Sequence, residues 1–161
     1  MKLYHGSLEI VKFPEIREAN RSLDYGTGFY TTTSFEQAEA WAKRRMKEKS
    51  IAKGYVNVYD FREETDNGLN VRRFIKPDEE WLDFVMANRT VKGFSHGYDI
   101  VCGPVADDRV YAAFALYEGG IINKRELIEA LKAYKLIDQY LFHDEKSLTS
   151  LSFTEFVEVT I

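Results

Sequence analysis

The fold is decided by two short segments near the start of the chain, Tyr4-His5-Gly6-Ser7 and Gly26-Thr27-Gly28-Phe29-Tyr30-Thr31-Thr32. Residues 2–5 predict a short strand, and residues 28–32 predict a second strand that is entered through a glycine turn. A strand that ends in His-Gly-Ser brings an imidazole, an unhindered backbone and a hydroxyl to one point. The two segments together favour a pocket for a flat, polar ligand that contains a ring.

Tyr30 is the aromatic residue that we expect to line this pocket. Phe29 and Tyr30 point to opposite faces of a strand, so only one of them can face a ligand. A tyrosine at this place can stack on a heteroaromatic ring. Gly26 and Gly28 fit a plain hairpin or a bulge equally well. They do not form a phosphate-binding loop, because no Gly-Lys-Ser/Thr follows them.

Length and composition predict one soluble domain over residues 1–161. The chain is 45% hydrophobic and 30% charged, as ordinary globular proteins are. Its formal net charge of −4 argues against a general electrostatic attraction to nucleic acid or to an anionic membrane. Cys102 is the single cysteine, so no internal disulfide can form, and no segment is typical of a signal peptide or a membrane span. We therefore expect a cytoplasmic protein.

Hydrophobic periodicity along the rest of the chain predicts an α+β fold of short strands and intervening helices. Strands are expected over 55–61, 69–74, 98–105, 139–143 and 153–159, and helices over 35–49, from 77 onward, and over 107–118, 123–136 and 145–151. Ser34 is a good N-cap for the first helix, with Gln37 three residues later. Residues 98–105 show little alternation, which is typical of a central strand, so Cys102 is expected to be buried and unreactive.

The charged and metal-ligating residues do not by themselves form a site. The three histidines at 5, 96 and 143 make no zinc motif. The pairs Glu79-Glu80 and Asp107-Asp108 are explained by favourable interaction with helix N-termini. We therefore expect no metal. Gln139, taken alone, is expected to be an ordinary solvated glutamine ahead of a strand.

Taken in order, three segments resemble the motifs of the ADP-ribosyltransferases, in the His-Tyr-Glu branch that includes poly(ADP-ribose) polymerases and diphtheria-toxin-like enzymes. Residues 4–7 resemble the first motif, and residues 26–32, with the helix after them, resemble the second. Residues 139–143 resemble the third, with Gln139 where that family usually has glutamate. The resemblance implies a split β-sheet core with flanking helices.

The chain also resembles, nearly end to end, a poorly characterised prokaryotic family within this superfamily. The shared segments are Tyr98-Asp99-Ile100-Val101 and Gly103-Pro104-Val105-Ala106-Asp107-Asp108. By analogy with toxin–antitoxin pairs, this second resemblance implies a toxin with a small antitoxin protein as its partner.

The resemblance to ADP-ribosyltransferases implies NAD⁺ as co-substrate and assigns roles to the motif residues. His5 would hydrogen-bond the ribose next to adenine, and Gly6 and Ser7 would hold the nicotinamide carboxamide. Tyr30 would stack on the nicotinamide ring, and Gln139 would face the 2′-hydroxyl of the nicotinamide ribose. By this resemblance, His5, Tyr30 and Gln139 would form the catalytic set. The remaining NAD⁺-binding positions in the second motif are Gly28, Phe29, Thr31 and Thr32.

Gln139 shapes the expected reaction, because a glutamine carries no charge and cannot act as a general base. We therefore expect transfer of a single ADP-ribose to a macromolecular acceptor, protein rather than nucleic acid, instead of chain elongation. Asp24 and Glu145 are candidates for a base. Two alternatives stay open, an NAD⁺ glycohydrolase and a catalytically degenerate module that binds NAD⁺ or a partner.

Overall fold

The computed structural model describes residues 1–17, 23–63, 68–105, 108–133 and 137–161. These ranges hold one mixed β-sheet and several helices, so the predicted α+β fold is confirmed. The strands are β1 (Lys2–Ser7), β2 (Phe29–Thr32), β3 (Gly54–Phe61), β4 (Val71–Arg73), β5 (Ile100–Pro104), β6 (Asp138–Phe142) and β7 (Leu151–Val159). The helices are α1 (Phe35–Lys49), α2 (Glu79–Thr90), α3 (Asp108–Glu118), α4 (Lys124–Lys132) and α5 (Glu145–Leu148).

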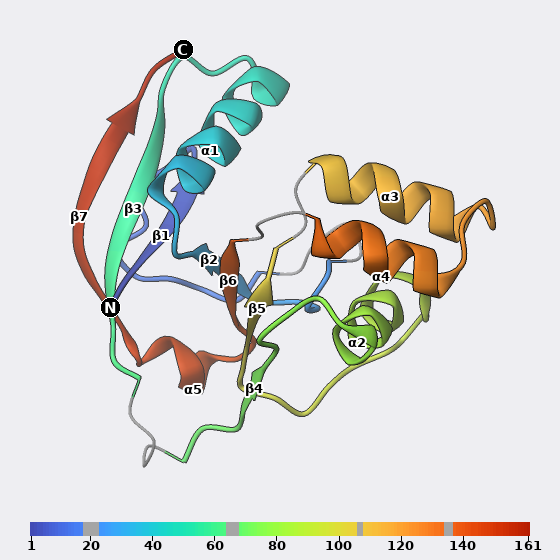
Figure 1. Ribbon diagram of the computed structural model, residues 1–161. Coiled ribbons are helices and arrows are strands. Elements are labelled where there is room, and N and C mark those ends of the chain that lie inside the picture. Colours follow the sequence, from blue (N-terminus) through green and yellow to red (C-terminus); the bar gives the residue numbers. More distant parts are fainter. Residues whose placement is uncertain (18–22, 64–67, 106–107, 134–136) are drawn as a thin grey trace.

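The seven-stranded sheet is divided into two halves, which Figure 1 shows as β1, β3 and β7 on one side and β2, β6, β5 and β4 on the other. Its strand order is β4-β5-β6-β2-β1-β3-β7. Strand β1 pairs with β3 over its whole length, from Lys2 to Ser7, and β2 pairs with β6 over its whole length. Strands β1 and β2 pair at one position only, Tyr4 opposite Thr32. The sheet is therefore split between β1 and β2 beyond that position.

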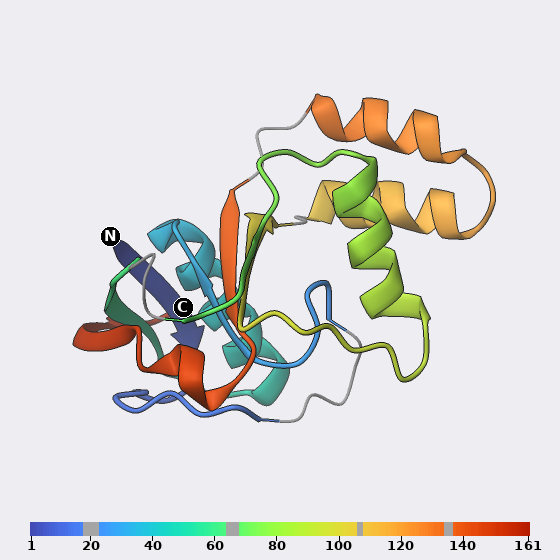
Figure 2. The same ribbon diagram turned by 90° about the horizontal axis from the view of Figure 1, so that it is seen from below.

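One face of the sheet carries four of the helices. Helix α1 covers the half with β1 and β3, where Ala38 and Met46 pack against Val56. Helices α2, α3 and α4 cover the other half and lie together in Figure 2. Their cluster of buried side chains includes Trp81, Phe114, Leu127 and, from the sheet, Leu141.

The second face of the sheet holds a separate core, closed on its outer side by α5 and the segment after β1. Leu3, Phe29 and Phe142 come from three different strands, and Leu148 comes from α5. Residues that alternate along a strand point to opposite faces. Phe29 therefore belongs to the α5 face, whereas Tyr30 packs against the cluster under α2, α3 and α4.

Local signals in the sequence explain most of the element boundaries. Helix α1 has the predicted bounds, and the Ser34 hydroxyl accepts a hydrogen bond from the Gln37 N–H at 3.2 Å, as expected of an N-cap. The segments expected at 98–105, 123–136 and 145–151 form shorter elements. Two predicted helices extend outside the described ranges: the helix at 123–136 at residues 134–136, and the helix at 107–118 at Asp107.

The expected burial of Cys102 is also confirmed. Cys102 is buried in β5, between β4 and β6, and burial raises the pKa of its thiol to about 11. Basic side chains at the middle of α1 form ion pairs on the helix surface, such as Lys43 with Glu39 and Arg44 with Glu48. Among the helices that the structure describes, none has the length and apolar character needed to span a bilayer.

Candidate functional site

His5 connects the two halves of the sheet at the split. Its Nδ1 lies 2.7 Å from the backbone carbonyl oxygen of Tyr30. Because a carbonyl only accepts, Nδ1 carries the proton of this hydrogen bond, and a neutral ring then presents Nε2 as an acceptor. Burial lowers the pKa of His5, although the bond to the Tyr30 carbonyl opposes that shift. The imidazole is therefore neutral near pH 7.

The edge of β1 beyond Tyr4 has no strand partner on the side of β2. Gly6 and Ser7 have register partners on β3 but none on β2. The Ser7 hydroxyl accepts a hydrogen bond from the Glu9 N–H at 3.3 Å. This edge is where backbone groups of the first motif face the split.

Gly6 is also required by packing, which the sequence did not reveal. A Cβ atom built at Gly6 would lie 2.0 Å from the backbone carbonyl oxygen of Ala38 in α1. Helix α1 therefore approaches β1 so closely that only glycine fits. Glycine at position 6 therefore has a structural reason, the close packing of α1, in addition to the expected one, an unhindered backbone for a ligand.

The Tyr30 hydroxyl is held by the turn that precedes β2. It donates to the Gly26 carbonyl oxygen at 2.5 Å and accepts from the Tyr25 N–H at 3.1 Å. Burial raises the pKa of Tyr30 well above its usual range. The phenol is therefore uncharged, and its ring has a fixed orientation on the face that α1, α2, α3 and α4 cover.

The side chains of Phe29, Thr31 and Thr32 in the second motif make packing contacts and hydrogen bonds within the protein. Phe29 is buried, with its ring centroid 4.2 Å from that of His5 and 5.8 Å from that of Tyr59. The Thr31 hydroxyl donates to the Tyr140 carbonyl at 3.0 Å, and the Thr32 hydroxyl accepts from the Ser34 N–H at 3.1 Å.

Gly28, the last of these residues, has a conformation and surroundings that a side chain does not tolerate. Its φ is 155°, and a Cβ atom there would lie 2.4 Å from the Phe142 carbonyl oxygen. The turn into β2 therefore requires glycine at this position because the backbone of β6 runs directly beside it.

Gln139 has a buried side-chain nitrogen without a hydrogen-bond partner in the described part of the chain. Its side chain is only 7% exposed, and its Nε2 has no hydrogen-bond partner among the described residues. Gln139 pairs with Thr32, which pairs with Tyr4, so the three lie in one row across β6, β2 and β1. Residues in one row share a face, so Gln139 lies on the Tyr30 face of the sheet, beside the one β1–β2 pair. The expectation that it is solvated when considered alone is wrong.

Tyr25 is the polar neighbour of Gln139. Its hydroxyl donates to the Pro104 carbonyl at 2.8 Å and accepts from the Trp81 indole N–H at 2.8 Å. Burial raises the pKa of Tyr25, and the Trp81 indole and the nearby Gln139 amide oppose that rise. The Gln139 amide interacts with the Tyr25 hydroxyl, but its Nε2 has no partner in hydrogen-bond geometry among the described residues. A buried donor in this state costs about 1–3 kcal/mol.

The two candidate bases lie in different places. Asp24 is buried and forms an ion pair with Arg89 of α2 at 3.1 Å, so its charge is compensated. Glu145 is exposed at the start of α5, on the other face of the sheet.

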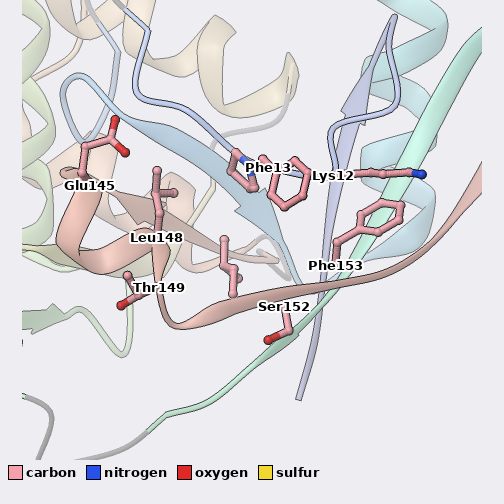
Figure 3. A pocket seen from close by; sticks show the side chains of 9 residues that line it. Lys12, Phe13, Glu145, Leu148, Thr149, Ser152 and Phe153 are labelled. Carbon is pink, nitrogen blue, oxygen red and sulfur yellow. The ribbon is translucent and has the colours of Figure 1, made fainter.

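A cavity of about 500 Å³ lies between the segment after β1, α5 and the start of β7. Figure 3 shows Phe13 and Leu148 along it, with Glu145 and Lys12 at opposite ends. None of the expected NAD⁺-binding residues lines this cavity.

Aromatic rings connect this cavity to the split. The His5 ring lies tilted against Phe29, Phe29 contacts Tyr59, and Tyr59 contacts Phe153 at the cavity with 5.9 Å between centroids. The cavity is therefore a second place at which a ligand near His5 can be sought.

His96 and His143 are far apart in the sequence and form no motif there, but the fold brings their rings together. Their ring centroids are 4.3 Å apart, and each ring is bonded to a backbone carbonyl of the turn before β2. Sequence reasoning missed this pair because the two residues come from loops that meet only in the folded sheet. Their positions carried no signal beyond the histidines themselves.

Comparison with known proteins places the chain in a family without assigning it an activity. No curated protein and no solved structure matches it. One family model matches residues 1–153, which is nearly the whole chain. The chain belongs to this family, which is described as a protein of unknown function (DUF3990).

Proposed function

We propose that this protein is a mono-ADP-ribosyltransferase that uses NAD⁺ as the ADP-ribose donor at the split between β1 and β2. The observation that carries the proposal is the buried Gln139 amide, whose Nε2 has no partner and which lies on the Tyr30 face beside the one β1–β2 pair. A buried donor without a partner is unusual in a folded protein, and a bound polar ligand is one way to satisfy it. The three segments that resemble the ADP-ribosyltransferase motifs are adjacent here through the paired residues Tyr4, Thr32 and Gln139, and the His5 ring lies on the other face of the sheet, against Phe29.

Each residue has a role that its observed contacts permit. The neutral His5 ring offers Nε2 as an acceptor for a ribose hydroxyl. The unpaired edge of β1 at Gly6 and Ser7 offers backbone and hydroxyl groups to a carboxamide. Tyr30 offers a ring whose orientation is set by two hydrogen bonds, so stacking on nicotinamide costs little entropy. These roles amount to positioning of the donor.

Gln139 limits the chemistry because its amide is neutral. Cleavage of the bond between nicotinamide and ribose develops positive charge on the ribose, and a carboxylate would stabilise that charge better than an amide does. Replacing a charge-assisted hydrogen bond by a neutral one costs roughly 1.5–3 kcal/mol, or about one to two powers of ten in rate. A weakened site of this kind favours a single transfer over chain elongation.

We propose a protein acceptor and a role as the toxin of a toxin–antitoxin pair, held by a small antitoxin protein. The net charge of −4 favours a protein acceptor over a nucleic acid. The test of this part is growth of a bacterial host during expression of the chain. Arrest that requires His5 and Tyr30 supports it, and unimpaired growth at high expression contradicts the toxin role.

The reaction itself is tested with NAD⁺ labelled in the adenine half. Label retained on protein supports transfer, and free ADP-ribose without an adduct supports a glycohydrolase. Binding of NAD⁺ without release of nicotinamide at high protein concentration supports a degenerate binding module. The Gln139→Glu variant is expected to release nicotinamide about ten- to a hundredfold faster than the wild type, and an unchanged rate would count against Gln139 as the limiting residue.

A further inference from the structure

Strand β7 forms one edge of the sheet, and its outer side is a free row of backbone groups. It comes last in the strand order and pairs with β3. Figure 1 shows it as the outermost strand, with no other described element beyond it. The opposite edge strand, β4, has three residues, whereas β7 has nine. Alternate N–H and C=O groups of such an edge point away from the sheet, so they can pair with another strand.

A bulge interrupts the first half of β7 and leaves the second half regular. Phe153 and Glu155 lie opposite successive residues of β3, so Thr154 is the extra residue of β7. A bulge disturbs strand pairing next to it and protects an edge there. Residues 155–159 follow in unbroken register with β3. These five residues are therefore a regular strand with a free outer side.

The side chains of this segment are exposed on both faces of the sheet. Residues 154–158 are all exposed, although alternate residues of a strand point to opposite faces. Val157 is 40% exposed and lies opposite the buried Val56, on the face that α1 covers further inside the sheet. Phe156 is 44% exposed on the other face, where its ring contacts Tyr55. A strand added at this edge would cover apolar surface on both faces.

The segment Glu155-Phe156-Val157-Glu158-Val159 complements itself when two copies pair antiparallel. A two-fold axis perpendicular to the sheet places one residue opposite its own copy. When that residue is Val157, the whole segment pairs and each glutamate meets an apolar residue. Glu155 then faces Val159, and Glu158 faces Phe156. No glutamate lies directly opposite a glutamate, an arrangement that would destabilise the pairing.

The bulge and an ion pair both favour this register. The neighbouring symmetric register, centred on Phe156, would pair Glu158 with Thr154, which the bulge displaces. The Thr154 hydroxyl is also bonded within the chain, because it donates to the Val58 carbonyl at 3.1 Å. The Glu158 carboxylate forms an ion pair with Lys53 at 3.4 Å, so its charge is partly compensated.

We infer that β7 is a self-association surface, at which two copies of this chain pair antiparallel through residues 155–159 about a two-fold axis at Val157. The pairing joins two seven-stranded sheets into one and covers the apolar side chains on both faces. Five residues of strand make a small interface, so the dimer forms only as the protein concentration rises. Strands β3 and β1 separate β7 from the split, and the inference does not rest on the proposed function.

Sedimentation equilibrium from about 10 µM to about 500 µM protein tests the association. The wild type is expected to form dimers within this range. Val157→Glu places two carboxylates opposite each other and is expected to weaken association at least about tenfold. Val91→Glu is the matched control, since Val91 is 55% exposed at the end of α2, and it is expected to associate as the wild type does. A monomeric wild type, or equal association of the two variants, overturns the inference.

A mixture of two charge variants separates the pairing from a folding defect. Val157→Arg mixed with Val157→Glu places opposite charges across the two-fold axis. The mixture is expected to associate at least about tenfold more tightly than Val157→Glu alone. Circular dichroism shows that both variants are folded. A mixture of folded variants that stays monomeric overturns the pairing at Val157.

Cysteine variants test the register itself. Val157→Cys places two thiols opposite each other, within the Cα separation that a disulfide spans. Mild oxidation is expected to give a covalent dimer of this variant but not of Glu155→Cys, whose new thiol would face Val159 of the second copy. Cys102 does not compete, because it is buried and the pKa of its thiol is raised to about 11. Equal cross-linking of the two variants would indicate random collision and overturn the proposed pairing.

Discussion

At Gly6 the absence of one methyl group sets the distance between α1 and β1. A Cβ atom there would lie 2.0 Å from the Ala38 carbonyl oxygen and 3.1 Å from the Ala42 nitrogen, which are both backbone atoms of α1. Neither atom can move without shifting the helix. Gly6 therefore joins the first motif to the packing of the whole β1–α1 unit.

Gly6→Ala is accordingly expected to lower the free energy of unfolding by about 1–3 kcal/mol, the usual cost of overpacking. Denaturation in urea measures this change. Gly97→Ala is the matched control, since a Cβ atom at Gly97 meets nothing within 4 Å and is expected to change stability little. Equal stability of the two variants would contradict the close packing of α1 on β1.

Gln139 is expected to reduce stability in the protein without ligand. Because its Nε2 is buried without a partner, Gln139→Met, which has no polar donor, is expected to raise the free energy of unfolding by about 1 kcal/mol. Gln37→Met is the control, since Gln37 accepts a hydrogen bond from the Thr32 hydroxyl at 3.4 Å and its loss is expected to destabilise. A Gln139→Met protein that is less stable than the wild type would show that the amide already has a partner.

Residue identity predicted part of this site. His5, Tyr30 and Gln139 could be selected because the motifs hold residues that bind flat polar ligands. Their hydrogen bonds could not be predicted, because the partners of Tyr30 and His5 depend on the split between two strands. The burial of Gln139 follows from its row across three strands, which local sequence does not encode.

At the scale of elements, helix α1 was predictable and strand β3 was only partly so. The bounds of α1 follow from local signals, the cap at Ser34 and the helical spacing of Ala38, Ala42 and Met46. Strand β3 alternates in sequence as a half-buried strand does, yet adjacent residues such as Val58 and Tyr59 are both buried. The reason is tertiary, because β3 is paired on both edges and the sheet is covered on both faces at this point.

His5 and His96 bond to backbone carbonyls of other segments, and their lowered pKa values predict how the stability of the protein depends on pH. Burial lowers the pKa of His5 and of His96 in the folded protein, whereas an unfolded histidine titrates near 6.5. As pH falls below about 6.5, the unfolded chain takes up these protons first. The free energy of unfolding is therefore expected to decrease as pH falls from 7 toward 5.5, by at most about 1.4 kcal/mol per pH unit for each histidine.

Thermal unfolding measured over this pH range in wild type and in His5→Gln checks the prediction. The variant is expected to show a shallower pH dependence, because it lacks one of the two groups. An identical pH dependence in both proteins would mean that His5 is not held neutral by the fold.

At the scale of the whole molecule, the α+β class was predicted, whereas the strand order was not. The order β4-β5-β6-β2-β1-β3-β7 brings the third motif beside the second and the second beside the first. Motif order along the chain carries no information about this adjacency. The same order brings His96 near His143, which no spacing in the sequence indicates.

The structure therefore offers two places for a ligand, the split between β1 and β2 and the cavity beside α5. The central claim is that NAD⁺ binds at the first of them. The cavity lies on the His5 face of the sheet, whereas Tyr30 and Gln139 lie on the opposite face. A single binding experiment with resolution at the level of residues separates them.

That experiment is a titration of the ¹⁵N-labelled protein with NAD⁺, followed by NMR. The account predicts chemical-shift changes at the backbone amides of residues 5–7 and 29–32 and at the side-chain amide of Gln139. Nicotinamide alone should reproduce the changes at Tyr30 and Gln139. Changes confined to cavity residues such as Phe13, Leu148 and Phe153, or no changes at millimolar NAD⁺, would contradict it.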